Sequence, residues 1–562
     1  MKEKRWRLKP APPPGFAPSL GFNPFQAQLL YNRGIKHRAE AERFFACDAF
    51  SLPDPSLLPD VDRALERLNR ALSSHETVAV FGDFDTDGVT GTALLTQSLR
   101  QLGGQVIPYI PHRVREGHGL SGEAVHLLAE KGVKLLVTVD TGTTSVEEID
   151  LASSLGIDTI ITDHHALPPT LPSALAIVNT KRPDSRYPFA DLAGVGLAFK
   201  LTQALFDQLG KEWPRDLLEL VALGTVADLA PLKGENRYLV REGLKVINST
   251  RRKGLQEIIR LAGLRPGKIT TEGISYGLAP RLNAAGRLDH AITSLHLLTT
   301  EDPEEASRLA QELEEHNRQR QRLTEEAFSL ALDYVASQQS LEPLLIVGDK
   351  GFSPGIVGLI ASKLVDRYYR PAIALSLEEE VLRGSARSIP EFNIVAALGQ
   401  CRELFVRFGG HPQAAGFTMK PGNLDELRSR LKQIAITSLN VEELIPTIDI
   451  DAQVSLGTLD RDNLRFIETL EPFGQENPAP VFLTRNARVA EARLFGNDSK
   501  HLKMKLRQER ATWEAVAFGQ GSPGDLPGPF IDVVYSLGID SWGTEERLRI
   551  NVLDFRPAGR GI

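Results

Sequence analysis

The sequence contains few cysteines and lacks any long hydrophobic run. Only two cysteines occur among 562 residues, Cys47 and Cys401, and they stand far apart in no metal-binding spacing. This scarcity excludes a disulfide-stapled scaffold and a cysteine zinc site, and we expect both thiols to be reduced, as in cytoplasmic proteins. No apolar run approaches the ~20 residues that a membrane-spanning helix needs. The basic N-terminal residues precede no apolar segment, so we expect no signal peptide, no membrane association and a cytoplasmic location.

The sequence also lacks an excess of basic charge. Its formal net charge of −7 at pH 7 argues against a globally basic nucleic-acid-binding protein. Binding to nucleic acid is still open, because acidic residues can gather at a metal site while basic residues gather elsewhere. Hydrophobic residues make up 42% and charged residues 24%, a balance typical of folded globular proteins. A chain of 562 residues exceeds a single hydrophobic core, so we expect two to four domains.

Short apolar, β-branched runs alternate with helical patterns in the first part of the chain. The strand-like runs are 77–82, 105–110, 135–140 and 158–163. Helical patterns of about 10–15 residues separate them, and this alternation predicts βαβ units with a parallel sheet. Because the runs are apolar throughout, we expect helices on both faces of the sheet.

A mainly helical region follows the predicted sheet. It contains helices at 193–209, 216–227 and 237–249 and a predicted loop at 280–290. The stretch 303–338 is the longest helix candidate. Asp302 can cap its first turn and Glu305 can complete a capping box, while its many charged residues suit a connector between two domains.

A second α/β pattern and then short strands occupy the rest of the chain. A strand at 343–349, a helix at 355–369 and a strand at 372–377 form the α/β pattern. The later strands predict a small barrel: 481–495, 501–507, 513–518, 530–537 and 546–555. The predicted domains are an N-terminal arm with helices (1–75), a parallel-sheet α/β domain (76–300), a connector helix (301–340), a second α/β domain (341–446) and the barrel (447–562).

Acidic and imidazole side chains gather where the predicted strands end. They are Asp83, Asp85 and Asp87 after the first strand, Asp140 at the end of the third, and Asp163, His164 and His165 at the end of the fourth. Ligands of open parallel sheets bind outside the carboxyl ends of the strands, so we expect one shared crevice. Clustered carboxylates repel each other unless a cation neutralises them, and the imidazoles favour Mn²⁺ over Mg²⁺. A single Asp-x-Asp is usually a solvated loop, but three such strand ends favour a metal site, which Asp228 joins from an apolar context.

The order and spacing of these motifs resemble a known family. DFDTDGVTGT, VTVDTGTTS, TDHH and GTVADLAPL resemble the four motifs of the DHH phosphoesterase superfamily. GSARS and RFGGHPQAAGF resemble its DHH-associated domain, while PRLNAAGR and EPFGQENPAPVF are similar to segments of the RecJ family of single-strand-specific 5′→3′ exonucleases. The resemblance runs from LYNRGI (30–35) to the end of the sequence and implies an OB-like barrel.

This resemblance implies a two-metal site that holds Mn²⁺, or Mg²⁺ in its place. It assigns Asp83, Asp85 and Asp140 to one ion and Asp87, Asp140, His164 and Asp228 to the other, with Asp140 bridging. His165 would lie beside the scissile phosphate, to donate a hydrogen bond or to protonate the leaving oxygen. Asp163 would orient its neighbours.

Several residues suit the recognition of phosphate. Arg113, Ser385 and Arg387 resemble the family's pocket for a terminal 5′-phosphate, which would set the polarity of degradation. Arg281 and Arg287 suit phosphate because a guanidinium group donates two parallel hydrogen bonds. Taken singly, each of these residues is equally typical of an ordinary surface.

Further strand-binding candidates lie later in the chain. The stretch 501–507 alternates basic and apolar residues, so one strand face would carry His501, Lys503, Lys505 and Arg507 toward a phosphate backbone. Aromatic residues nearby offer stacking surfaces or barrel core: Phe495, Trp513 and Trp542. His411 follows two glycines, which permit close approach of a strand or simply a tight turn. Ser353 departs from the family, since many relatives carry His at this position.

The leading hypothesis is a 5′→3′ exonuclease that releases 5′-mononucleotides from single-stranded DNA in repair and recombination. The alternatives are a DHH-family hydrolase of short oligonucleotides or cyclic dinucleotides, and a non-catalytic single-strand-binding relative. The stretch 450–562 argues against the first alternative, and the filled ligand positions argue against the second. We expect a monomer, and the resemblance implies a single-strand-binding protein and a helicase as partners.

Overall fold

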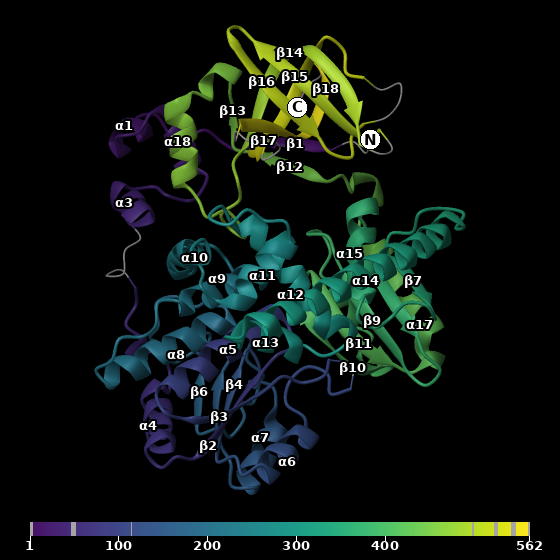
Figure 1. Ribbon diagram of the computed structural model, residues 1–562. Helices are drawn as coiled ribbons and strands as arrows, with labels where there is room; N and C mark the ends of the chain where they lie inside the picture. The colour runs from purple at the N-terminus through teal and green to yellow at the C-terminus, as the bar shows by residue number, and fades with distance from the viewer. Residues whose placement is uncertain are drawn as a thin grey trace. The chain divides into compact units, whose positions relative to one another are not determined.

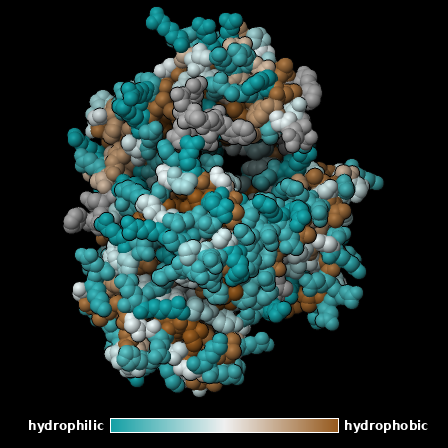
Figure 2. Space-filling view, viewed as in Figure 1, coloured by the Kyte–Doolittle hydropathy of each residue, from teal (hydrophilic) through white to brown (hydrophobic). Residues whose placement is uncertain are grey.

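The computed structural model describes residues 4–46, 52–113, 115–496, 499–521, 526–540 and 547–559 (Figure 1). The chain forms two compact units: Leu52–Leu444, and Met1–Ser51 together with Ile445–Ile562. Among the described residues, no helix is both long and apolar enough to cross a membrane. Hydrophilic residues cover most of the face seen in Figure 2, and hydrophobic residues form scattered groups on it. Cys401 is a buried free thiol, while Cys47 and Trp542 lie outside the described residues.

A parallel sheet of five strands forms the centre of the larger unit, in the order β3-β2-β4-β5-β6. Its strands are β2 (Thr77–Gly82), β3 (Gln105–Tyr109), β4 (Leu135–Val139), β5 (Asp158–Thr162) and β6 (Ala176–Val178). The first four confirm the predicted strands. The sequence analysis missed β6, because three residues are too short a run to show a pattern.

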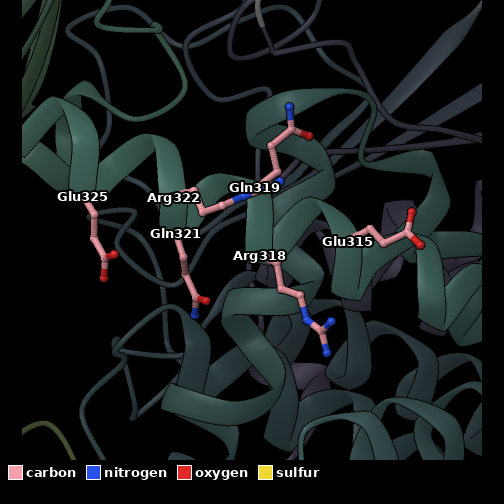
Figure 3. Close-up of a pocket in the computed structure, with 6 residues that line it drawn as sticks. All are labelled: Glu315, Arg318, Gln319, Gln321, Arg322 and Glu325. Carbon is pink, nitrogen blue, oxygen red and sulfur yellow. The ribbon is translucent and has the colours of Figure 1, made fainter. Parts of the chain in front are cut away.

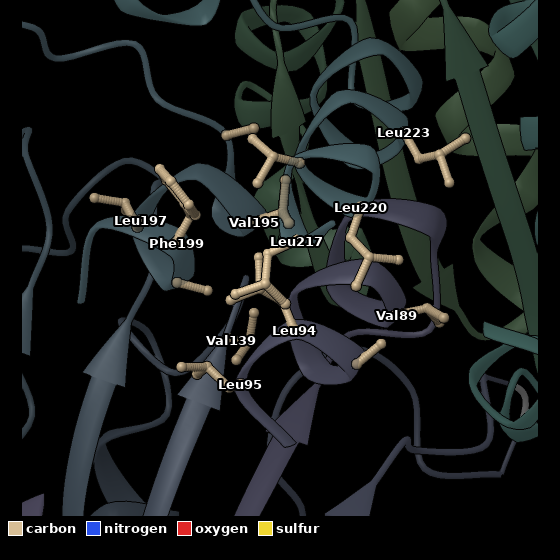
Figure 4. Close-up of a cluster of buried hydrophobic side chains, with 14 of the residues drawn as sticks. Val89, Leu94, Leu95, Val139, Val195, Leu197, Phe199, Leu217, Leu220 and Leu223 are labelled. Carbon is tan, nitrogen blue, oxygen red and sulfur yellow. The ribbon is translucent and has the colours of Figure 1, made fainter. Parts of the chain in front are cut away.

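Helices cover both faces of this sheet, as predicted. One face packs against α5 (Thr86–Gln101), α8 (Gly194–Gln208) and α9 (Leu217–Ala227), whose apolar side chains meet in the cluster of Figure 4. The other face packs against α6 (Gly122–Glu130) and α7 (Val146–Ser154). The neighbouring helices are α4 (Val61–Ser73), α10 (Gly234–Ile247), α11 (Lys253–Leu261) and α13 (Ile292–Thr299). Each fully buried Leu, Val or Phe of these clusters contributes about 1.5–3 kcal/mol of transfer free energy, so the strand ends rest on a rigid base.

The predicted loop at 280–290 is wrong, because this stretch is mainly helical. A π-helical turn at Gly273–Leu278 leads directly into α12 (Ala279–Leu288). Pro280 lies in the first turn, where its missing N–H costs nothing. Gly286 lies against the chain after β2, and a Cβ added to it would come within 2.9 Å of the Phe84 carbonyl oxygen. Pro280, which suggested a loop, therefore lies in the first turn of a helix, and Gly286 permits a close packing contact.

The predicted connector helix is confirmed as α14 (Pro303–Ala336). The Asp302 carboxylate accepts a hydrogen bond from the Glu304 N–H and caps the helix. The predicted capping box is wrong, because Glu305 accepts a hydrogen bond from the Thr300 hydroxyl instead. The helix packs against α11, α12 and α13 along one part and against the second α/β region along another.

The second α/β region contains a mixed sheet in the order β10-β11-β9-β8-β7. Its strands are β7 (Leu345–Asp349), β8 (Ala372–Leu377), β9 (Leu382–Arg387), β10 (Phe405–His411) and β11 (Ala414–Met419), and its helices are α15 (Val357–Tyr368), α16 (Ile394–Gly399) and α17 (Leu424–Ser438). The predicted strands and helix at 343–377 are confirmed. The segment GGHPQAAGF forms the β10–β11 hairpin, with β10 at the edge of the sheet.

The smaller unit contains a closed barrel, as predicted. Its strands are β14 (Val481–Phe495), β15 (His501–Gln508), β16 (Ala511–Ala517), β17 (Phe530–Asp540) and β18 (Arg547–Pro557), and the β14–β17 pairing closes it. The predicted alternation in β15 is confirmed, because Leu502, Met504 and Leu506 are buried while the intervening residues face outward.

The N-terminal segment belongs to the barrel unit, which nothing in the sequence pattern indicated. β1 (Arg5–Leu8) pairs in parallel with β12 (Thr447–Ile450). The same unit contains α1 (Phe16–Leu20), α2 (Pro24–Tyr31), α3 (Arg38–Ala46), β13 (Ala452–Gln453) and α18 (Arg461–Thr469). Leu29 and Leu30 of α2 share a buried cluster with barrel residues such as Phe482.

Candidate active site

The first two carboxylates of the site follow β2 directly. Asp83 is buried at the end of the strand. Asp85 is the N-cap of α5, and its Oδ1 accepts hydrogen bonds from the backbone N–H groups of Asp87 (2.9 Å) and Gly88 (3.1 Å). One Asp85 oxygen therefore fixes the start of the helix, which sets the orientation of the carboxylate.

Asp87 lies in the first turn of α5 and is held by a second helix. Its Oδ2 accepts a hydrogen bond from the Gly194 N–H at 2.7 Å, and its Oδ1 accepts one from the Val195 N–H at 2.8 Å. These N–H groups belong to the first turn of α8, where donors are unpaired and the helix dipole favours an anion. A Cβ added to Gly194 would lie 2.6 Å from the Asp140 Cβ, so only glycine permits this close approach.

Asp140 stands at the centre of the cluster in an unusual conformation. It follows β4 with a φ of 60°, the left-handed region that a residue with a Cβ rarely adopts. Its Oδ1 lies 3.0 Å from the Nε2 atom of His164. Such backbone strain commonly marks a functional site, because the surrounding structure must stabilise it.

Three overlapping groups of side chains have the spacing of metal ligands. Within each group one ligand atom per residue lies within 4.8 Å of the others: Asp83, Asp85 and Asp140; Asp87, His164 and Asp228; and Asp140, His164 and His165. The structure thus brings all six predicted metal ligands together at the carboxyl ends of the strands. Asp140 and His164 each belong to two of the groups, so the three groups form one connected cluster.

The electrostatics of these groups fit a divalent cation. Among the described residues, Asp83 Oδ1, Asp140 Oδ1 and His164 Nε2 are buried polar atoms without a hydrogen-bond partner. Burial, and then repulsion between the carboxylates, raises the pKa values of Asp85, Asp87 and Asp140, and raises that of Asp228 to about 7. Burial and the charge of His165 lower the pKa of His164 to about 3, so this imidazole is neutral and able to bind metal.

His165 differs from its neighbour because it carries a proton. Its Nδ1 lies 2.7 Å from Asp163 Oδ1, and Asp163 also accepts hydrogen bonds from the backbone N–H groups of His165 (3.1 Å) and Thr143 (3.0 Å). Burial alone would lower the pKa of His165, but the hydrogen bond and the charge of Asp163 raise it to about 9. Burial would raise the pKa of Asp163, but the bond to His165 holds it well below its usual range. The pair therefore presents an imidazolium beside the candidate metal ligands.

A second group of predicted residues also lies close together: Arg113, Arg287 and Arg387 with Ser385, which we call the arginine pocket. The Nη1 of Arg387 donates to Ser385 Oγ at 3.1 Å, and a Cβ on Gly358 would lie 3.1 Å from both side chains. The Arg113 guanidinium lies 4.9 Å from the centre of the Phe84 ring, next to the first carboxylates. Burial, and then the charges of Arg113, Arg320 and Arg387, lower the pKa of Arg287 to about 9. Such crowding of buried cations favours an anion from outside the protein.

Other predicted residues have partners within the protein. Arg281 donates to Glu314 at 2.6 Å and to the Gly277 carbonyl at 2.7 Å, which joins α12 to α14. Ser353 lies in the turn before α15, where its carbonyl accepts from the Ile356 N–H. His411 is exposed at the end of β10.

The predicted barrel residues lie in the smaller unit. Lys503 pairs with Glu514 at 2.5 Å and Lys505 with Glu491 at 3.5 Å, while Arg507 is exposed. Of the predicted aromatic residues, Phe495 is exposed beside His501, and Trp513 is partly buried with its Nε1 directed to the Leu456 carbonyl at 3.3 Å.

Sequence reasoning missed three residues of the site. His118 lies 3.4 Å from Asp83 Oδ2 and 4.3 Å from the Phe84 ring. Asn283 accepts hydrogen bonds from the backbone and hydroxyl of Thr86, at 2.9 and 3.0 Å. Lys181 donates to the His164 carbonyl. Asn283 lies in the quoted segment PRLNAAGR and could have been named, whereas nothing in the sequence marks the other two.

A pocket on α14 is separate from this site. All six of its lining side chains come from one exposed helix face and point in several directions in Figure 3: Glu315, Arg318, Gln319, Gln321, Arg322 and Glu325. Both signs of charge alternate along it, as on an ordinary solvated helix. It therefore offers no enclosed binding site.

Comparison with known proteins identifies the family. Three family models match the chain: the DHH family N-terminal domain at 77–225, the DHHA1 domain at 339–437 and the RecJ OB domain at 450–554. The single-stranded-DNA-specific exonuclease RecJ of Bacillus subtilis (strain 168) is 40% identical over 539 residues, covering 95% of this chain and 68% of the relative. The crystal structure of RecJ from Thermus thermophilus in complex with Mn²⁺ has a TM-score of 0.84 at 29% identity, covering 99% of this chain and 80% of that one. The Mg²⁺ complex has a TM-score of 0.78 at 28% identity, covering 99% and 79%. With these domains in this order, the chain belongs to the RecJ family.

Proposed function

We propose that this chain is a metal-dependent exonuclease that hydrolyses single-stranded DNA from its 5′ end and releases 5′-mononucleotides, in repair and recombination. The single observation that carries this proposal is the arginine pocket beside a carboxylate cluster in which one buried oxygen each of Asp83 and Asp140 has no hydrogen-bond partner. Such a site suits a terminal phosphate next to a phosphodiester. The names of the relatives, single-stranded-DNA-specific exonuclease RecJ, support the same substrate.

The metal centre of the proposal holds two Mn²⁺ ions, or Mg²⁺ in their place. Asp83, Asp85 and Asp140 would bind one ion, and Asp87, Asp140, His164 and Asp228 the other. The orphaned oxygens and the raised carboxyl pKa values support this assignment, and structures of a relative contain each of these metals. When bound, the cations lower the pKa of water and neutralise charge that develops on the phosphate.

In the proposed reaction, His165 and Asp163 are responsible for proton donation. Because the pKa of His165 is about 9, this residue carries a proton at neutral pH. It can donate a hydrogen bond to the scissile phosphate or give its proton to the 3′-oxygen of the first nucleotide, which is the leaving group when the P–O3′ bond breaks. Asp163 fixes the ring through Nδ1, which leaves the Nε2 proton free for the substrate.

In this proposal the arginine pocket determines from which end the strand is degraded. A strand whose terminal 5′-phosphate occupies this pocket can extend its first internucleotide phosphate toward the carboxylate cluster. Arg113 supports this placement, because the charges of both Asp83 and Asp85 act on it. The barrel, a single-strand-binding protein and a helicase would assist a monomeric enzyme in the cytoplasm.

The test is degradation of a long single strand labelled at its 3′ end, with Mn²⁺ and with EDTA. We expect the labelled strand to shorten progressively from its 5′ end, fastest when it is 5′-phosphorylated, with the labelled mononucleotide appearing last, and no product with EDTA. A strand with a 5′-hydroxyl and a duplex serve as comparisons. Faster hydrolysis of a dinucleotide than of the strand would favour the small-substrate alternative, and binding without hydrolysis would favour a non-catalytic relative.

A further inference from the structure

The segment that follows β6 holds the backbone of both site histidines. Asn179 is fully buried, and its Nδ2 donates a hydrogen bond to the His165 carbonyl at 3.1 Å. Its Oδ1 accepts the Lys181 N–H at 2.9 Å, and the Lys181 ammonium donates to the His164 carbonyl. The last strand of the sheet, which sequence reasoning missed, therefore brings a lysine to the site.

Lys181 is exposed, yet its charge reaches several groups of the site. It lowers the pKa values of Asp228, His164 and His411, in each case after burial and other charges. His165 and Lys181 both act on His411, which belongs to the β10 edge strand of the second sheet.

Two residues of β10 lie near other parts of the site. Arg407 approaches the loop after β3, since a Cβ on Gly117 would lie 3.9 Å from Arg407 Nη1. At the end of the strand, the charges of His165 and Lys181 act on His411.

Cationic groups thus flank the carboxylate cluster on two sides. The arginine pocket interacts with Asp83 and Asp85, as the charges acting on Arg113 and Arg287 show. Lys181 follows β6, the edge strand at the other end of the sheet from β3, and donates to the His164 carbonyl. A strand with its terminal phosphate in the pocket and its scissile phosphate at the centre would carry its third phosphate to the Lys181 side.

We propose that Lys181 binds the phosphate that follows the scissile phosphate on its 3′ side. This subsite rests on the proposed function and deepens it, because it makes the enzyme read three consecutive phosphates. A Lys ammonium acts as a point charge that suits the variable geometry of a moving backbone. The preferred short substrate is then a 5′-phosphorylated trinucleotide, which has three phosphates, rather than a dinucleotide, which has two.

The test replaces the third phosphate of the trinucleotide by an uncharged methylphosphonate. For the wild-type enzyme with Mn²⁺ we expect kcat/KM to fall about tenfold, the value of one charge-assisted contact. Lys181→Ala should lower kcat/KM for the unmodified trinucleotide by a similar factor, and the methylphosphonate should then add little further loss. Lys181→Arg keeps the charge, so the ratio of kcat/KM for the unmodified and the methylphosphonate trinucleotide should stay close to the wild-type ratio.

Two further variants separate charge from structure. Lys181→Gln keeps a donor for the His164 carbonyl but has no charge, so it should behave as Lys181→Ala does. Lys131→Ala removes an exposed lysine after α6, on the turn leading to the amino end of β4, and should retain the wild-type tenfold discrimination. Mn²⁺ binding, followed by EPR, should be similar in the Lys181 variants and the wild type.

The outcomes distinguish this inference from the function on which it rests. An equal methylphosphonate penalty in wild type and Lys181→Ala would overturn the subsite and leave Lys181 a structural role. Insensitivity of the wild type to the methylphosphonate would overturn it as well, while the exonuclease activity stood. Failure of the wild type to cut any unmodified strand would instead overturn the proposed function.

Discussion

The carboxylate cluster of the larger unit and the outer face of the barrel both carry many charges, but in opposite ways. In the cluster several carboxylates lie close together and Asp87 and Asp140 are buried, so burial and mutual repulsion raise the pKa values of these two residues. On the barrel each lysine is partly exposed and lies beside a glutamate. Buried like charges are unstable until a cation joins them, whereas exposed pairs are worth at most about 1 kcal/mol. The carboxylate cluster therefore requires a cation, whereas the lysines of the barrel can exchange their glutamate partners for phosphates at little cost in free energy.

Loss of a central carboxylate should have the largest effect. Asp140→Asn removes a member of two of the three ligand groups. We expect Mn²⁺-dependent hydrolysis to fall more than roughly a hundredfold, since even the loss of groups behind metal ligands costs up to that much. Without metal, the variant should melt at a higher temperature than the wild type, because one repelling charge is gone.

Activity assays and thermal melting with EDTA check both parts of this prediction. Asp150→Asn, on the exposed face of α7, is the matched control and should change neither quantity. Hydrolysis by Asp140→Asn at the wild-type rate would contradict the metal assignment.

A substitution in the arginine pocket tests whether its clustered cations also require a ligand of opposite charge, as the carboxylates do. Arg387→Ala should lower the preference for a 5′-phosphoryl over a 5′-hydroxyl end about tenfold, because it removes a charged hydrogen-bond donor. The measurement is the ratio of kcat/KM for the two ends. Arg322→Ala, on the exposed flank of α14 in Figure 3, should leave that ratio unchanged. An unchanged ratio in Arg387→Ala would remove the pocket from end recognition.

The metal-free protein should lose stability as pH rises from about 6.5 to about 9. Asp228, with a pKa raised to about 7, and His165, with a pKa raised to about 9, both bind protons more tightly in the folded chain. The contribution of His165 is lost between about pH 6.5 and pH 9, and that of Asp228 between about pH 4 and pH 7. Below about pH 6.5 the loss at Asp228 is offset by His164, whose lowered pKa acts in the opposite direction.

Melting temperatures at several pH values, with EDTA and with Mn²⁺, measure this effect. We expect a fall of several degrees without metal. Mn²⁺ should flatten the curve, because the carboxylates then bind a cation instead of protons. An identical slope under both conditions would show that no ion binds at Asp228.

Substitutions on the outer face of the barrel should have the smallest effect. Lys505→Ala should weaken binding of single-stranded DNA only a few-fold and reduce the salt slope of log K by about 0.7, the value for one phosphate contact on a single strand. Glu491→Gln removes the competing carboxylate and should strengthen binding slightly. Titrations at several salt concentrations compare the two variants. Equal salt slopes in wild type and Lys505→Ala would exclude a phosphate contact at this residue.

Local patterns in the sequence predicted much of the fold. The strands β2 to β5 were recognisable because each is a continuous apolar run, and β15 because it alternates with a period of two. The stretch 280–290 was wrongly predicted as a loop, because Pro280 and Gly286 look like turn residues when their packing is unknown. The pairing of β1 with β12 joins segments more than 400 residues apart, and a short strand contains no information about its partner.

The carboxylate cluster shows how far the sequence alone could lead. The sequence determined which acidic and imidazole groups follow the strands, and the parallel topology made their convergence predictable. Only the tertiary structure decided the protonation of the two adjacent histidines, because burial makes His164 neutral while Asp163 keeps His165 charged. It also decided that Arg281 pairs with Glu314 while Arg287 joins the arginine pocket, and that Lys181 reaches the site. Charge states and partners depend on distances across the fold, and neighbours in the sequence do not determine those distances.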